Sequence, residues 1–183
     1  MDERRVVVVG AGPAGAALAY LLARRGIGIT LLERHTDFAR EFRGEALMPS
    51  GVDAFVQMGL GAQFDGLPQT HVRRLEVYRG ARCLLRVSIR DFGIEGPRIV
   101  SQPAMLEMLV TEAGRFPTFQ LERGTTVRDL VREGERVVGV RTESSAGSHE
   151  VRGDLVVGAD GRASVLRVRA GLHEERTPQH FDV

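Results

Sequence analysis

The sequence of 183 residues is poor in cysteine and aromatic residues, lacks tryptophan and has almost no net charge. Its single cysteine, Cys83, excludes an internal disulfide, the reactive cysteine pair of disulfide-reducing enzymes and a cysteine-rich zinc site. The net charge of +1 argues against binding to nucleic acid or a membrane surface through bulk charge. A composition that is 43% hydrophobic and 27% charged is nevertheless sufficient to form a folded core.

The histidines show no spacing typical of metal ligands, so we expect no metal site. They are His35, His71, His149, His173 and His180.

An uncharged run of 18 residues, from Val6 to Ala23, reaches the length of a membrane-spanning helix. Glycines and Pro13 interrupt this run, and the valines at its start favour a strand. Asp2 and Glu3 precede the run, which does not fit an export signal. We therefore expect no membrane span and a cytoplasmic protein.

The first 33 residues have the pattern of a strand–helix–strand unit. Residues 6–9 are apolar at every position, which is typical of a parallel strand buried on both faces. Residues 14–26 predict a helix that ends near Gly26, and residues 27–33 predict a second strand. Three leucines give the helix an apolar face at helical spacing: Leu18, Leu21 and Leu22.

Gly10, Gly12 and Gly15 lie between the first strand and the helix. Glycines at this spacing allow a tight turn and a close backbone approach to a diphosphate, and the helix beginning near Pro13 directs its free N–H groups toward that anion. Glu33 follows Gly15 by 18 residues, where a carboxylate can accept hydrogen bonds from a ribose and repels a 2′-phosphate. The pattern predicts FAD or NAD rather than NADP; a strand–helix–strand unit that binds no dinucleotide is the alternative.

The remaining segments predict further helices and strands. Residues 42–60 fit a loop followed by a helix, and residues 101–116 fit a second helix. Residues 72–92 alternate apolar and polar side chains, which predicts an antiparallel hairpin entering a second, smaller domain. Several strands with turns between them follow, and residues 155–157 predict a buried strand.

Five segments, in this order, resemble the FAD-dependent aromatic monooxygenases of the para-hydroxybenzoate hydroxylase and ubiquinone-biosynthesis hydroxylase type. The segments are "GAGPAG", "LLERH", "FRGEALMPSG", "SQPAMLEML" and "DLVVGADGRASVLRVRAGL". The resemblance covers nearly the whole chain, and "GADGRASVLR" is its more specific part because plain NAD dehydrogenases lack it.

The resemblance implies an α/β fold: a Rossmann-like FAD-binding domain with a parallel sheet and a β-meander, plus part of an antiparallel substrate-domain sheet. The FAD-binding domain is expected at residues 1–71 and 101–171, and the partial substrate domain at 72–100 and 172–183. Members of this family are longer and carry a further strand and a second FAD motif. We therefore expect that this chain lacks a C-terminal half, or that a partner chain provides it. We also expect that this chain by itself binds FAD weakly and hydroxylates poorly.

The resemblance also implies which residues contact FAD. The diphosphate would be lined on one side by Gly10, Gly12, Pro13, Ala14 and Gly15, and on the other side by Asp160 and Gly161. The adenosine ribose would contact Glu33 and Arg34, and the adenine would contact the backbone of Val127. The extended chain of FAD would contact Arg43, Gly44 and Gln102. Structural alternatives remain for several of these residues. Arg43 could be a solvated loop arginine, Gln102 an ordinary residue of a helix start, and Asp160 part of a turn.

In this family NAD(P)H reduces the flavin, oxygen adds to it, and the resulting hydroperoxide hydroxylates an aromatic ring. The cofactor supplies the difficult chemistry, and the sequence shows no nucleophile–base pair or carboxylate dyad, so we name no catalytic residue. Two alternatives remain. One is another flavoenzyme, either a halogenase, which the absence of tryptophan disfavours, or a prenyl reductase; the other is a non-catalytic FAD-binding module.

Overall fold

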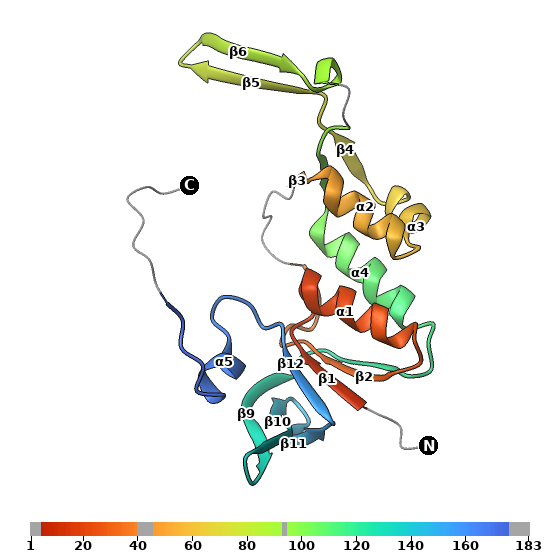
Figure 1. The fold of residues 1–183 in the computed structure, drawn as a ribbon, viewed down its shortest axis with the longest axis vertical. Helices are drawn as coiled ribbons and strands as arrows, with labels where there is room; N and C mark the ends of the chain where they lie inside the picture. Colours follow the sequence, from red (N-terminus) through yellow and green to blue (C-terminus); the bar gives the residue numbers. More distant parts are fainter. Residues whose placement is uncertain (1–4, 40–45, 93–94, 176–183) are drawn as a thin grey trace. The chain divides into compact units, whose positions relative to one another are not determined.

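The computed structural model describes residues 5–39, 46–92 and 95–175, shown as a ribbon in Figure 1. The chain forms two compact units. The first contains Met1–Asp37 and Glu112–Val183, and the second contains Phe38–Thr111. The units are groups of residues in mutual contact, so the division into FAD-binding and substrate domains stays a prediction.

A four-stranded parallel sheet forms the centre of the first unit. Its spatial order is β12 (Leu155–Gly158), β1 (Arg5–Val9), β2 (Gly28–Leu32) and β8 (Phe119–Glu122). All four valines of β1 are buried, as expected for a strand covered on both faces. The α/β fold with a parallel sheet and additional antiparallel sheets is thus confirmed.

Helix α1 (Pro13–Ala23) follows β1 and contacts β2. Its buried positions are mostly small residues, which allow a helix to approach a sheet closely: Gly15, Ala16, Ala19, Tyr20 and Ala23. The three leucines predicted to form its apolar face are only half-buried. The alanines, rather than the leucines, therefore determine how this helix packs.

The end of α1 is formed as predicted at Gly26, which has a φ of +74°. The N–H of Gly26 donates to the carbonyl of Ala23 at 2.9 Å, and the N–H of Ile27 donates to the carbonyl of Leu22 at 3.2 Å. This pair of bonds satisfies the last helix carbonyls and requires the left-handed conformation that glycine adopts without strain.

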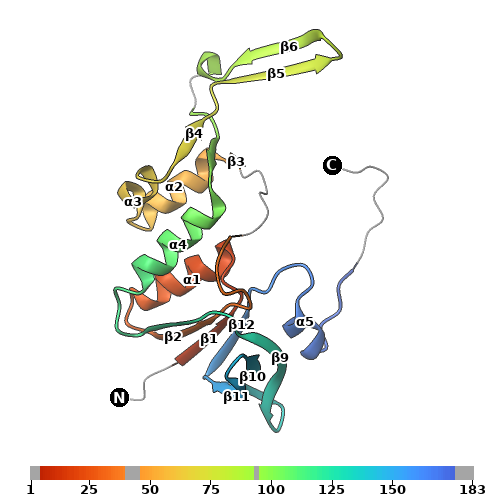
Figure 2. The ribbon, with the colours of Figure 1, turned by 180° about the vertical axis from the view of Figure 1, so that it is seen from behind.

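A three-stranded antiparallel sheet covers the face of the parallel sheet opposite α1, as Figures 1 and 2 both show. Its strands are β9 (Thr126–Glu133), β10 (Arg136–Ser144) and β11 (Gly147–Arg152). The core between the two sheets consists of Val7, Val9, Leu32, Val127, Val140, Val151 and Leu166. Leu166 belongs to helix α5 (Val165–Arg169). This packing explains why alternate valines of β1 are buried on the side away from α1.

The prediction that residues 155–157 are buried is wrong: Leu155 is 55% exposed, and Val156 and Val157 are half-buried. The strand exists as β12, but it is paired only with β1 among the described strands. An outer strand has one neighbour instead of two, so its side chains are less covered.

The second unit contains short strands, helices and a hairpin. One antiparallel sheet has the order β3 (Ala46–Leu47), β7 (Arg98–Val100) and β4 (Gln69–His71). Its helices are α2 (Pro49–Gln57), α3 (Gly61–Asp65) and most of α4 (Gln102–Ala113), with a short 3-10 helix η1 (Ile89–Phe92). Both helices predicted in this region are present. Phe55 of α2 and Phe64 of α3 stack at 4.7 Å between ring centroids, which joins these two helices.

The predicted hairpin is formed by β5 (Arg74–Arg79) and β6 (Arg82–Ser88), which pair antiparallel. Its turn contains Gly80 with a φ of +58°.

Within the described ranges, no helix is both long and apolar enough to cross a membrane. The same ranges contain no group of three or more His, Cys, Asp or Glu residues that could hold a metal ion.

Candidate functional site

The turn between β1 and α1 lies directly against the loop that follows β12. An ideal Cβ on Gly10 would lie 2.5 Å from the carbonyl oxygen of Ala159 and 2.9 Å from the Cα of Asp160. The N–H of Ala159 donates to the carbonyl of Val9 at 2.7 Å, and the N–H of Gly10 donates to the carbonyl of Leu32 at 2.8 Å. Two motifs about 150 residues apart are thereby joined at the carboxyl ends of neighbouring parallel strands.

Gly15 is needed for packing inside this turn. An ideal Cβ at this position would collide with the carbonyl oxygen of Gly10. Gly10 itself has a φ of +98°, which side chains rarely tolerate. Gly10 and Gly15 are therefore required by the backbone conformation and packing of the protein.

Gly12 is different because the protein does not require a glycine there. Its φ of −68° and ψ of −179° are ordinary extended values. Apart from the neighbouring residues of the chain itself, no atom of the described residues lies within 4 Å of an ideal Cβ on Gly12, and the same holds for Gly161. Open space beside Gly12, at the start of α1, leaves the backbone accessible to a ligand.

Pro13 and Ala14 form the exposed first turn of α1. Pro13 has no N–H to leave unpaired at this position. Gly12 precedes the helix and provides no side-chain cap, so the N–H groups of the first turn that lack an intrahelical partner face the accessible end of the helix. The positive end of the helix dipole adds a weak attraction for an anion.

Glu33 is 3% exposed and connects two loops at the end of β2. One carboxylate oxygen accepts from the N–H of Ala11 at 2.9 Å, and the other accepts from the N–H of His35 at 3.1 Å. Each oxygen has more than one lone pair, so the carboxylate can still accept hydroxyl groups of a ligand. Arg34 is exposed beside it and donates from Nε to Nε2 of His35 at 3.0 Å.

The carboxylate of Asp160 bonds to the start of α5. Oδ1 accepts from the hydroxyl of Ser164 at 2.6 Å, and Oδ2 accepts from the N–H groups of Val165 at 2.7 Å and Leu166 at 3.2 Å. Ser164 in turn accepts from the N–H of Arg167 at 3.0 Å. Sequence reasoning missed Ser164, although a serine directly before a helix is an ordinary capping signal.

The other predicted contact residues are distributed more widely. Val127 is buried in the core of the first unit and pairs with Thr142 across β9 and β10. Gln102 begins α4 in the second unit. Arg43 and Gly44 lie outside the described residues.

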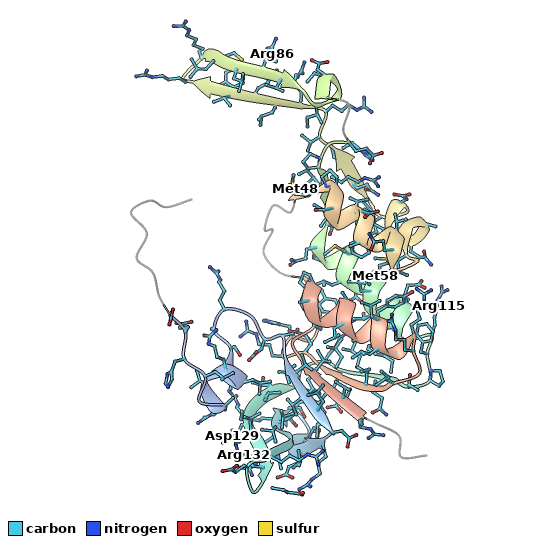
Figure 3. All side chains as sticks on the ribbon, in the orientation of Figure 1. Met48, Met58, Arg86, Arg115, Asp129 and Arg132 are labelled. Atoms are coloured by element: carbon cyan, nitrogen blue, oxygen red, sulfur yellow. The ribbon has the colours of Figure 1, made fainter. Side chains whose placement is uncertain are left out.

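The hairpin has two unlike faces, and Figure 3 shows Arg86 on it. Leu75, Val77 and Leu85 share one face and are 55%, 43% and 48% exposed. On the other face Glu76 accepts from the Tyr78 hydroxyl at 2.6 Å and from Nε of Arg86 at 2.7 Å. The hydrogen bond from Tyr78 lowers the pKa of Glu76 and raises the pKa of Tyr78 itself.

Comparison with known proteins identifies the family of the chain. Residues 3–183 match the FAD binding domain family. A 6-methylpretetramide 4-monooxygenase of Streptomyces rimosus is 40% identical over 177 residues, which cover 93% of this chain and 41% of that protein. The chain thus spans less than half the length of this relative.

Two solved structures are also similar. The structure of PqsL from P. aeruginosa in complex with 2-aminobenzoylacetate has a TM-score of 0.79 at 26% identity, covering 96% of this chain and 48% of that one. The myxobacterial chondrochloren halogenase CndH has a TM-score of 0.73 at 26% identity, covering 91% of this chain and 39% of that one. The resemblance to FAD-dependent monooxygenases is confirmed, and the chain belongs to the FAD binding domain family.

Proposed function

We propose that this chain binds FAD with the diphosphate between the turn at Gly12 and the loop at residues 159–161. The observation that carries this proposal is the open space beside Gly12 and Gly161, on two loops that touch at Gly10 and Ala159. Neither conformation nor packing requires a glycine at position 12, and a ligand that approaches the backbone of Gly12 would explain it; Gly161 is also required by its φ of +85°. Backbone N–H groups at the start of α1 would bind the diphosphate oxygens.

The adenosine ribose would lie at Glu33. Its carboxylate is held by the N–H groups of Ala11 and His35, so its orientation is set before a ligand arrives. The proposed contacts also include Arg34, which lies beside Glu33, and the backbone of Val127. The extended part of FAD would contact Arg43, Gly44 and Gln102.

We further propose that the whole enzyme hydroxylates a small aromatic molecule using NAD(P)H and O2. Bound FAD would supply the redox chemistry, while the residues of this chain bind and orient it. The exposed apolar face of the hairpin, with Leu75 and Val77, would provide one wall for the substrate.

Halogenation is a second candidate because the chain is similar to CndH. A prenyl reductase and a non-catalytic FAD module are further alternatives. Oxygen consumption with phenolic substrates would favour the hydroxylase, and chloride-dependent product formation would favour the halogenase. Absence of any FAD binding by this chain, at the highest FAD concentration tested, would contradict the proposed cofactor site.

Titration of the purified chain with FAD and with riboflavin tests the cofactor proposal. Riboflavin lacks the diphosphate and the adenosine, so we expect FAD to bind at least about tenfold more tightly, corresponding to about 1.4 kcal/mol. Flavin fluorescence provides the measurement. Equal affinities for the two flavins would contradict the proposed diphosphate site.

A further inference from the structure

Arg98 is a largely buried charged residue of the second unit. Its side chain is 12% exposed and lies on β7, the middle strand of the sheet formed with β3 and β4. Nη1 donates to a carboxylate oxygen of Asp65 in α3 at 2.6 Å and to the side-chain oxygen of Gln69 in β4 at 3.4 Å. Nη2 lies 3.6 Å from the carboxylate of Glu95, and Cζ lies 5.8 Å from the centre of the Phe64 ring. One side chain thus connects β7 to both α3 and β4.

Stability alone does not explain why an arginine is buried here. Nε of Arg98 is buried and has no acceptor among the described residues, which costs free energy. The side chains of Asp65 and Glu95 are 65% and 77% exposed, so solvent weakens both ion pairs. An apolar side chain of similar volume is often no less stable than a buried ion pair. An arginine buried at such a cost points to a role in positioning the segments around it.

Two of the proposed FAD contacts are close to β7 or its partner strand along the chain. Gln102 begins α4 and follows Val100, the last residue of β7, by two positions. Strand β3 pairs with β7 through Ala46 opposite Ile99, and β3 begins two positions after Gly44 in the sequence. The sheet therefore joins the stretch that follows Gly44 to the stretch that precedes Gln102.

The start of α4 is bonded directly to the end of β7. The carbonyl of Ser101 accepts the N–H of Met105 at 3.0 Å, and the Ser101 hydroxyl accepts the N–H of Ala104 at 3.4 Å. Val100, directly before Ser101, is 3% exposed and pairs with Gln69, whose side chain also accepts from Arg98. A shift of β7 would therefore be transmitted to the first turn of α4.

We propose that Arg98 is a positioning residue for Gln102. By binding β7 to α3 and β4, its guanidinium group fixes the strand end from which α4 begins. It thereby holds Gln102 where the extended part of FAD is received, without touching FAD itself. This inference rests on the proposed FAD site and gives Arg98 a role that sequence reasoning missed.

A double-mutant cycle tests whether Arg98 acts through Gln102. Arg98→Met removes the charge and keeps an apolar side chain, and Gln102→Ala removes the proposed contact. We expect each single variant to weaken FAD binding at least about threefold, and the double variant to bind FAD as weakly as Gln102→Ala, within about twofold. Arg152→Met is the matched control: Arg152 also lies 2.6 Å from a carboxylate but is 57% exposed on β11, so FAD affinity should equal that of the wild type.

The cycle has three outcomes that contradict the inference. Losses that multiply in the double variant would show that Arg98 and Gln102 act independently. Wild-type FAD affinity in Arg98→Met would show that Arg98 does not support the cofactor site. Wild-type affinity in Gln102→Ala would overturn the proposed contact at Gln102, and the inference with it.

Amide hydrogen exchange without FAD provides a second readout that does not depend on cofactor binding. Exchange at Met105 should accelerate at least about fivefold in Arg98→Met, while the Tm stays within about 4 °C of the wild type. Asp65→Ala removes the nearest partner of Arg98 from an exposed position and takes the place of Arg98→Met in both measurements if that variant does not fold. Exchange that stays at the wild-type rate would overturn the inference. Accelerated exchange together with failure of the wild-type chain to bind FAD would instead overturn the proposed function.

Discussion

At the scale of single residues, the glycines of the first turn have separate tasks. Gly10 and Gly15 are required by backbone conformation and by contacts within the chain, whereas Gly12 has ordinary dihedral angles and open space. The sequence predicted all three as one diphosphate motif. It could not separate them, because the distinction depends on the folded backbone: the positive φ of Gly10, the approach of the Gly10 carbonyl to Gly15, and the approach of Ala159 to Gly10.

Gly12→Ala should weaken FAD binding at least about tenfold, because its Cβ would occupy the space proposed for the diphosphate. The free energy of unfolding should change by less than about 1 kcal/mol, since no protein atom is displaced. Gly15→Ala is the contrasting variant: its Cβ collides with the carbonyl of Gly10, so the loss of stability should be about 1–3 kcal/mol or more. Urea denaturation and FAD titration measure the two effects, and a destabilised Gly12→Ala with normal FAD affinity would contradict the assignment.

Glu33→Gln should lower the free energy of unfolding by about 1–3 kcal/mol. The amide oxygen of glutamine can accept one of the two N–H groups that Glu33 now binds, and the NH2 group leaves the other without an acceptor. Glu135→Gln, in an exposed turn, is the matched control and should be neutral. Equal stability of the two variants would show that the buried carboxylate does not support these loops.

At the scale of elements, most of the fold follows from local pattern. The strand–helix–strand unit, the hairpin, the turn at Gly26 and the helix predicted at residues 101–116 all appear where the sequence predicts them. The face that α1 buries could not be predicted, because three leucines at helical spacing outweigh alanines in any measure of hydrophobicity. Close contact between α1 and the sheet favours small side chains on the helix. Only the tertiary structure shows how close the helix and the sheet are.

Ala19→Leu should therefore cost about 1–3 kcal/mol of stability, because Ala19 is fully buried on the packed face of α1. Ala14→Leu, on the same helix but exposed, should change stability by no more than about 0.5 kcal/mol. Thermal or urea denaturation of the two variants gives the comparison. Equal stability would mean that α1 packs through another face.

At the scale of the whole molecule, the glycine turn at residues 10–15 and the loop at residues 159–161 belong to the first unit, while Gln102 and the hairpin belong to the second. The chain spans 41% of the Streptomyces monooxygenase and 48% of PqsL. The sequence resemblance indicated both the family and this partial coverage. It could not show that Leu155 is exposed, because that depends on which strands neighbour β12.

The 183 residues alone should bind FAD weakly and should show little NAD(P)H-dependent hydroxylation of phenols, as the resemblance to a longer family leads us to expect. FAD titration at several protein concentrations, with oxygen uptake measured in parallel, tests both expectations. Tight stoichiometric binding together with turnover would contradict them and would show that these 183 residues form a sufficient catalytic unit.

The central claim is that the diphosphate of FAD lies between the turn at Gly12 and the loop at Gly161. A crystal structure of the chain grown with excess FAD tests it most directly. We predict diphosphate oxygens within hydrogen-bond distance of backbone N–H groups at the start of α1 and next to the loop containing Gly161, with Glu33 at the ribose. FAD bound elsewhere, or side chains filling the space between these two loops, would contradict the account.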